Sequence, residues 1–149
     1  MSSVEKPRVG EVLPGEAWKM LSEDPGAVLI DVRTRAEWTF VGIPELDDMA
    51  NPFLLVEWQI WPDMTENPKF VEMVMEQLWG REPRMLFFLC RSGYRSLKAA
   101  EAMTAHFQDL GQPSECVNVL GGFEGDKDEA RHRGTKNGWK AAGLPWRQG

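Results

Sequence analysis

The chain has 149 residues, and its length and 42% hydrophobic content suit one domain whose core needs no disulfide or metal. With 17 basic and 23 acidic residues the net charge is −6, which argues against nucleic-acid binding, because phosphate contact needs a surplus of Lys and Arg. No apolar run approaches the roughly 20 residues that cross a bilayer, and the first residues lack the apolar stretch of a secretory signal. We therefore expect a cytoplasmic protein without nucleic-acid or membrane partners.

The first ten residues are polar and interrupted by Pro and Gly, so we interpret 1–10 as a flexible arm with a short edge strand near 9–12. Residues 11–149 then form a single domain. Helical spacing of apolar side chains predicts a helix over 14–23. A continuous apolar run over 27–32 predicts a strand that is buried on both faces.

The rest of the chain continues this alternation of strands and helices. Residues 47–68 hold two tryptophans among prolines, and this mixed pattern predicts partial helix and loop. The other expected elements are helices over 35–40, 68–79, 92–110 and 139–142, and strands over 84–89 and 116–120. Alternating strands and helices predict βαβ units and an α/β domain with helices on both faces of a parallel sheet.

The chemically informative segment joins the predicted strand over 84–89 to the helix that follows it. Cys90 stands at the C-terminal tip of this strand, where open α/β sheets bind their ligands. The next residues enter a helix N-terminus, which favours an anion, and Gly93 allows successive N–H groups to point inward. Arg91 and Arg95 add positive charge. A lone cysteine is usually a small buried hydrophobe, but this combination favours a nucleophilic thiolate or a negatively charged persulfide.

Residues 90–95 closely resemble the active-site loop of the rhodanese family of sulfurtransferases. Other segments match the family in the same order along the chain. Residues 29–34 and the Glu-Trp pair after them resemble its N-terminal motif, and the Ile-Pro pair at 43–44 resembles its next element. Residues 119–125 and 138–145 resemble its C-terminal signature, which is split here by a charged insertion at 126–137.

The resemblance implies a three-layer domain with a central, mostly parallel five-stranded sheet. It also implies a sulfurtransferase that forms a persulfide on Cys90, without any metal or organic cofactor. The donor would be a small anion such as thiosulfate, and the acceptor cyanide, a thiol or a protein. Asp31 and Arg33 would form a supporting ion pair. The expected substrate- and persulfide-binding residues are Arg91 and Arg95 for donor charge, Ser92 for a hydroxyl contact to the persulfide, Gly93 for the cradle and Tyr94 at the entrance.

Two alternative functions remain open. A phosphatase or arsenate reductase also uses a Cys–Arg loop over an oxyanion, but such loops interpose one residue more than the four between Cys90 and Arg95. The other alternative is a rhodanese-like module that only docks a partner, a class that loss of the cysteine would mark.

The remaining candidate residues are given structural roles. Cys116 lies inside a predicted strand and is expected to be a packed thiol, and His106 and His132 lack the spacing of metal ligands. The polar segment 126–137 is expected to be a mobile surface loop at the sheet edge that carries Cys90. It is either a tolerated insertion or, with Trp58 and Trp61, a rim that selects the acceptor.

Overall fold

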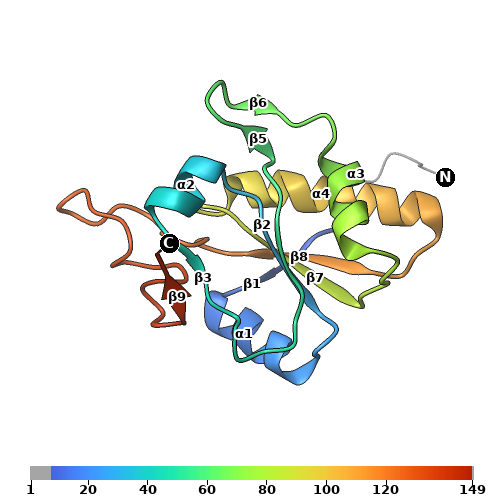
Figure 1. Cartoon of the computed structure of the whole chain (residues 1–149). Coiled ribbons are helices and arrows are strands. Elements are labelled where there is room, and N and C mark those ends of the chain that lie inside the picture. The colour runs from blue at the N-terminus through green and yellow to red at the C-terminus, as the bar shows by residue number, and fades with distance from the viewer. Residues whose placement is uncertain (1–7, 149) are drawn as a thin grey trace.

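The computed structural model describes residues 8–148. At its centre lies a five-stranded sheet of order β1-β8-β7-β2-β4, in which every neighbouring pair is parallel. Figure 1 shows helices on both sides of this sheet, as the alternating pattern predicts. The strands are β1 (Gly10–Val12), β2 (Val28–Asp31), β4 (Phe53–Leu55), β7 (Met85–Leu89) and β8 (Glu115–Val119). The predicted edge strand near residues 9–12 is confirmed as β1; residues 1–7 of the expected arm lie outside the described residues.

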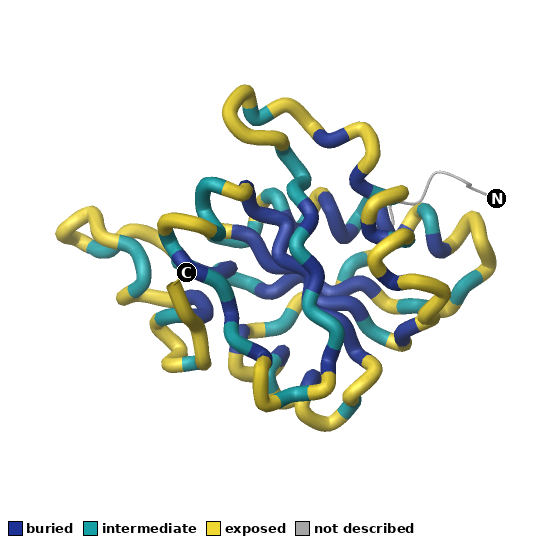
Figure 2. The backbone as a smooth tube through the Cα atoms, in the orientation of Figure 1, coloured by how far each residue is buried: buried dark blue, intermediate teal, exposed yellow. Residues whose placement is uncertain are grey.

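The sheet separates two apolar cores. Helices α3 (Phe70–Leu78) and α4 (Tyr94–Leu110) cover one face, and α1 (Pro14–Glu23) covers the other with part of the C-terminal segment. Along β7, Phe88 belongs to the first core and Phe87 to the second, as the alternation of side chains in a strand requires. The central strands β2 and β7 are apolar apart from Asp31, as suits strands that are covered on both faces, and Figure 2 shows the sheet as the buried centre of the molecule.

Helix positions agree closely with the sequence pattern. The helices predicted over 14–23 and 35–40 are observed as α1 and as α2 (Arg35–Phe40). At the start of α2 the Thr34 hydroxyl accepts the N–H of Glu37 at 3.3 Å, and the Glu37 carboxylate accepts the N–H of Thr34 at 3.2 Å. None of the helices formed by residues 8–148 has the length and apolar content needed to span a bilayer.

The prediction of partial helix within residues 47–68 is wrong. This segment supplies β4 and a small antiparallel hairpin of β5 (Gln59–Ile60) and β6 (Thr65–Glu66). Strand β4 has only three residues and pairs with β2, which lies far away in the sequence. A strand this short forms only because it pairs with β2, and the residues of β4 alone do not indicate that pairing.

The prediction of a helix over residues 139–142 is also wrong, because these residues form turns. A helix of this length makes too few hydrogen bonds to offset the cost of its first turn. Trp139 is fully buried instead, and its Nε1–H donates to the Pro145 carbonyl at 2.8 Å. The chain then forms β9 (Trp146–Arg147), which pairs antiparallel with β3 (Ile43–Pro44).

The ion pair expected between Asp31 and Arg33 is present and fully buried at the end of β2. The Arg33 Nη2 atom lies 2.6 Å from Asp31 Oδ2 and also donates to the Gly42 carbonyl at 2.7 Å. The guanidinium stacks on the ring of Phe123, with Cζ 4.2 Å from the ring centroid. Arg33 therefore connects β2 with the residue before β3 and with the segment after β8.

Replacing Asp31 by Asn should lower the free energy of unfolding by roughly 3–5 kcal/mol, because the buried Arg33 charge loses its counter-ion. Urea unfolding measures this loss. The matched control is Asp47→Asn, which removes the exposed pair between Asp47 and Arg147, whose side chains are 62% and 52% exposed. That variant should lose less than about 1 kcal/mol. Similar losses in both variants would contradict the structural role of the buried pair.

Candidate active site

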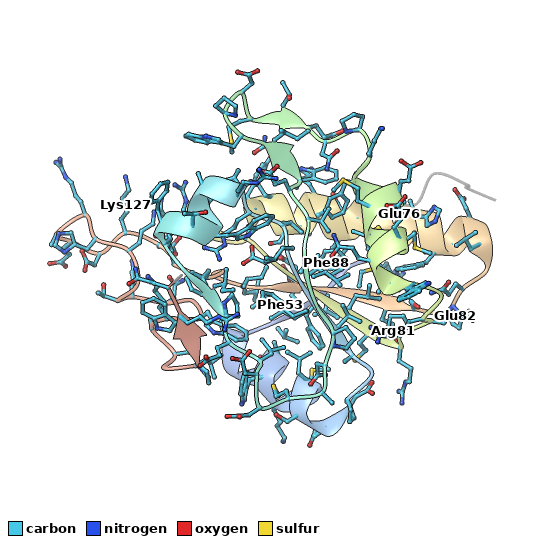
Figure 3. The ribbon with its side chains drawn as sticks, in the orientation of Figure 1. Phe53, Glu76, Arg81, Glu82, Phe88 and Lys127 are labelled. Atoms are coloured by element: carbon cyan, nitrogen blue, oxygen red, sulfur yellow. The ribbon has the colours of Figure 1, made fainter. Side chains whose placement is uncertain are left out.

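Cys90 follows β7 directly and lies at the C-terminal edge of the sheet. Figure 3 helps to locate this edge, because Arg81 and Glu82, which precede β7, lie at the opposite end of the molecule from Lys127 in the charged insertion. The Cys90 side chain is only 1% exposed, yet it lines a pocket of about 650 Å³. Its carbonyl accepts the N–H of Phe123 at 2.7 Å, so the segment after β8 holds the cysteine backbone in place.

Two glycines shape the loop around the thiol. Gly93 precedes α4 with φ of 111°, a conformation that side chains disfavour, and its N–H donates to Cys90 Sγ at 3.1 Å. Gly122, with φ of 62°, packs against the backbone of the same loop. A Cβ atom on Gly122 would overlap the Cys90 carbonyl oxygen and lie 2.6 Å from the carbonyl carbon of Arg91. The cysteine loop can therefore pack this closely against the segment after β8 only because position 122 is a glycine.

Ser96 places a hydroxyl within hydrogen-bond distance of the thiol. Ser96 Oγ lies 3.2 Å from Cys90 Sγ and 2.6 Å from Asn118 Oδ1. The Asn118 Nδ2–H in turn donates to the Gly93 carbonyl at 3.0 Å, which closes a ring of contacts through the buried residues Cys90, Ser96 and Asn118 and the half-buried Gly93. Ser92 lines the pocket, and no hydrogen bond recorded among residues 8–148 joins its hydroxyl to Sγ.

Sequence reasoning missed both Ser96 and Asn118. Ser96 lies just beyond the loop, on the first turn of α4, and faces back toward the thiol. Asn118 comes from the neighbouring strand β8, which pairs with β7. The one available signal is Asn118 itself, since a polar side chain inside an apolar strand must have a buried partner.

Arg95 lines the pocket, but its charge is engaged by Glu37. The two side chains form a bidentate pair, with Nη1–Oε1 and Nη2–Oε2 distances of 2.7 and 2.9 Å. Burial alone would raise the pKa of Glu37, but the hydrogen bonds and charge of Arg95 outweigh it and the pKa is lowered. The pair joins α4 to α2, and the binding of donor charge by Arg95 stays a prediction.

The charged insertion and one of the two candidate tryptophans reach the pocket. Arg133 of the insertion lines it and donates from Nη1 to the Gly125 carbonyl at 2.6 Å. Trp61, which is 56% exposed, also lines the pocket, whereas Trp58 packs edge-on against Phe70 in the core. The other lining residues are Thr34, Ala36, Glu37, Val41, Gln59, Met64, Cys90, Arg91, Ser92, Tyr94, Arg95 and Glu124.

The second cysteine has a different environment. Cys116 lies on β8 within the apolar core, as expected for a packed thiol. Burial raises the pKa of the Cys116 thiol to about 12. Cys116 is therefore protonated and unreactive at neutral pH, which leaves Cys90 as the candidate nucleophile.

The fold and the site define an α/β protein with a cysteine cradle at the C-terminal edge of a parallel sheet. No family model matches the chain. It is 38% identical over 138 residues to "Uncharacterized protein RP600 homolog" of Rickettsia rickettsii, covering 93% of this chain and 97% of that protein. "Uncharacterized protein RP600" of Rickettsia prowazekii is 35% identical over the same length and the same shares of both chains.

Solved structures give two further likenesses. The crystal structure of Rv0390 from M. tuberculosis aligns with a TM-score of 0.77 and 45% identity, over 95% of this chain and 98% of that chain. A rhodanese-like domain protein from Staphylococcus aureus aligns with a TM-score of 0.49 and 20% identity, over 76% of this chain and 87% of that chain. This chain belongs to the same protein family as Rv0390 and the rickettsial proteins.

The Glu37–Arg95 pair predicts a pH-dependent contribution to stability. The folded-state pKa of Glu37 is below its ordinary value of 4.5, so the pair stabilises the fold fully above that value. The contribution is lost as the pH falls through the lowered pKa. Glu37→Gln should therefore cost about 1–3 kcal/mol of unfolding free energy at pH 7, and the gap to the unchanged protein should close in acid. Urea unfolding at several pH values measures the gap.

The matched control is Glu101→Gln, which removes the longer and more exposed pair between Glu101 and Lys98, 3.7 Å apart. Its effect should be small at every pH. A Glu37→Gln loss that persists unchanged in acid would show that the pair does not carry the effect.

Proposed function

We propose that this protein is a rhodanese-type sulfurtransferase in which Cys90 carries sulfur as a persulfide. The observation that supports this most directly is the setting of the thiol, which lies at a strand tip, on a pocket, and within 3.1 Å of the Gly93 N–H. A fixed N–H at this distance stabilises negative charge on sulfur. The resemblance of residues 90–95 to the rhodanese active-site loop supports the same reaction.

The reaction is a double displacement. The Cys90 thiolate attacks the outer sulfur of thiosulfate, the S–S bond of the donor breaks, and sulfite leaves with the electron pair. The acceptor nucleophile then attacks the outer sulfur of the persulfide, and Cys90 returns as a thiolate. Sulfur changes carrier, and neither an oxidant nor an organic cofactor is required.

Ser96 and Asn118 position the single hydroxyl proton near the sulfur. The Ser96 hydroxyl lies within hydrogen-bond distance of both Cys90 Sγ and Asn118 Oδ1, but it has only one proton to donate. Asn118 Oδ1 accepts a hydrogen bond from the Ser96 hydroxyl while the thiol is protonated. When the thiolate or persulfide forms, the hydroxyl turns to donate to sulfur, so the negative charge gains a second donor.

The alternative of a phosphatase or arsenate reductase fits this site less well. The loops of such enzymes place five residues between the cysteine and the arginine that holds the oxyanion, whereas four separate Cys90 from Arg95, and Arg95 is bound at both Nη atoms by Glu37. A module that only docks partners does not need the buried Ser96 and Asn118 beside the thiol. Both alternatives predict that thiosulfate leaves the protein without added sulfur.

Incubation with thiosulfate should add the mass of one sulfur atom to the protein, and peptide mapping should place it on Cys90. Cys90→Ser should remove the addition and reduce transfer to cyanide to background, because no other thiolate is available. Cys116→Ser should keep most of the activity, since Cys116 is buried in the core with its pKa raised to about 12.

Sulfur found on a peptide that contains Cys116 alone would overturn the assignment of the nucleophile. A protein that gains no sulfur from thiosulfate but releases phosphate from an aryl phosphate would favour the phosphatase alternative. A protein that does neither would favour the docking module.

Arg91 is the arginine available to attract the donor. It is exposed beside the pocket, and none of the ion pairs formed within residues 8–148 involves it. Arg91→Ala should raise the KM for thiosulfate about fivefold to tenfold, as expected for the loss of one charged contact. High salt should narrow this difference by screening the attraction in the unchanged protein.

The matched control is Arg84→Ala, which removes the same charge from an exposed position just before β7, at the other end of that strand. Its KM should stay near that of the unchanged protein. Equal increases in KM in both variants would show that Arg91 acts only through the net charge of the protein.

A further inference from the structure

We propose that the β5–β6 hairpin builds an apolar subsite beside Cys90, and that this subsite binds the organic substituent of a thiol acceptor. The inference rests on the proposed function and names the class of its acceptor: a thiol that carries an aromatic or bulky apolar group. The hairpin lies in the segment 47–68, whose two tryptophans belong, in one of the two interpretations of the sequence, to a rim that selects the acceptor.

The size of the pocket is the first argument. Its volume of about 650 Å³ lies within the range of roughly 300–1,000 Å³ that holds drug-sized ligands. Thiosulfate, cyanide or the outer sulfur of a persulfide would fill only a small part of this volume. The pocket therefore has space for a substituent attached to the reacting sulfur.

Contacts at the base of the hairpin hold it in place, so it forms a fixed side of the pocket. Trp58 packs against the Phe70 ring with centroids 5.1 Å apart, and the Asn67 N–H donates to the Trp58 carbonyl at 2.8 Å. The carboxylate of Glu57 accepts the backbone N–H of Arg35 at 3.0 Å, which ties the base to the start of α2. Figure 1 shows the hairpin projecting from the sheet next to α2 and α3.

The residues that the hairpin presents to the pocket are largely apolar. Trp61 and Met64 line it from the hairpin, and Val41 lines it from the end of α2. The nearby Glu37 carboxylate is neutralised by Arg95, so it does not repel an apolar group. Three charged lining residues, Arg91, Arg133 and Glu124, take part in none of the ion pairs within residues 8–148, and together they leave a net positive charge. They come from the loop after β7 and from the segment after β8. The lining thus combines charge for an anionic donor with an apolar wall for the acceptor.

The transfer step follows from this arrangement. The thiolate of the acceptor attacks the outer sulfur of the Cys90 persulfide, and the bond between that sulfur and Sγ breaks. Cys90 leaves as a thiolate, and the acceptor carries the new persulfide. Contact of the substituent with Trp61 holds the attacking sulfur near the persulfide, which raises the rate for aromatic thiols above that for small polar ones.

The first experiment measures the subsite without using sulfur transfer. Iodoacetamide and N-benzyliodoacetamide carry the same reactive group, and intact mass reports how fast each alkylates Cys90 in a Cys116→Ser background. The benzyl reagent should be favoured in the parent protein, and Trp61→Ala should lower the benzyl-to-plain rate ratio at least threefold, about the effect of one aromatic contact. Trp61→Phe should restore most of the ratio. Trp79→Ala, at a 91% exposed tryptophan outside the pocket, should leave it unchanged.

The second experiment measures the acceptor. Cys90 persulfide formed with thiosulfate is mixed with benzyl mercaptan or 2-mercaptoethanol, and the ratio of the two transfer rates should fall in Trp61→Ala but not in Trp79→Ala. Rate ratios that are independent of Trp61 in both experiments would overturn the subsite while leaving the sulfurtransferase intact. A Trp61-dependent alkylation ratio in a protein that takes no sulfur from thiosulfate would support an aromatic subsite but overturn the sulfurtransferase. Failure of both reagents to alkylate Cys90 would overturn the subsite, and the addition of sulfur from thiosulfate decides the sulfurtransferase separately.

Discussion

The buried guanidinium of Arg33 joins three parts of the chain that must meet for the site to exist. Its charge is balanced by Asp31 at the end of β2, it binds the Gly42 carbonyl before β3, and it stacks on Phe123. The N–H of Phe123 in turn holds the carbonyl of Cys90. Because an unpaired charge in this interior would be costly, the partners of Arg33 are fixed, and so is the position of the cysteine loop.

The site combines buried and open surroundings around one sulfur atom. On the inner side Cys90 contacts the buried Ser96 hydroxyl and the N–H of the half-buried Gly93, and Asn118 hydrogen-bonds to both of these residues. On the outer side it borders a pocket large enough for an organic substituent. In the function proposed above, the inner contacts would stabilise charge on sulfur and the outer pocket would select the acceptor. This separation would allow the pocket walls to vary without changing the chemistry at the thiol.

The sequence predicted the parts of the fold that depend on local pattern. The helix spacing gave the bounds of α1 and α2, and the apolar runs gave β2, β7 and β8. The loop at residues 90–95 was found because its cysteine, glycine and arginines are adjacent in sequence. Strand β4 was missed because its partner β2 is distant in sequence. The β5–β6 hairpin was missed because each of its strands has only two residues, too few to show an alternating pattern. Trp139 was placed in a helix because its burial against distant residues was not visible.

By itself the sequence determined that this is an α/β protein with a cysteine loop at the C-terminal end of a buried strand. Periodicity, turn residues and adjacency carry that information, because they act within a few residues of the chain. Only the tertiary structure decided which charges are free and which groups touch the sulfur. Arg95 is neutralised by Glu37 from α2, and Ser96 is oriented by Asn118 from β8. These contacts join residues far apart in sequence, and their partners are set by how helices and strands pack together.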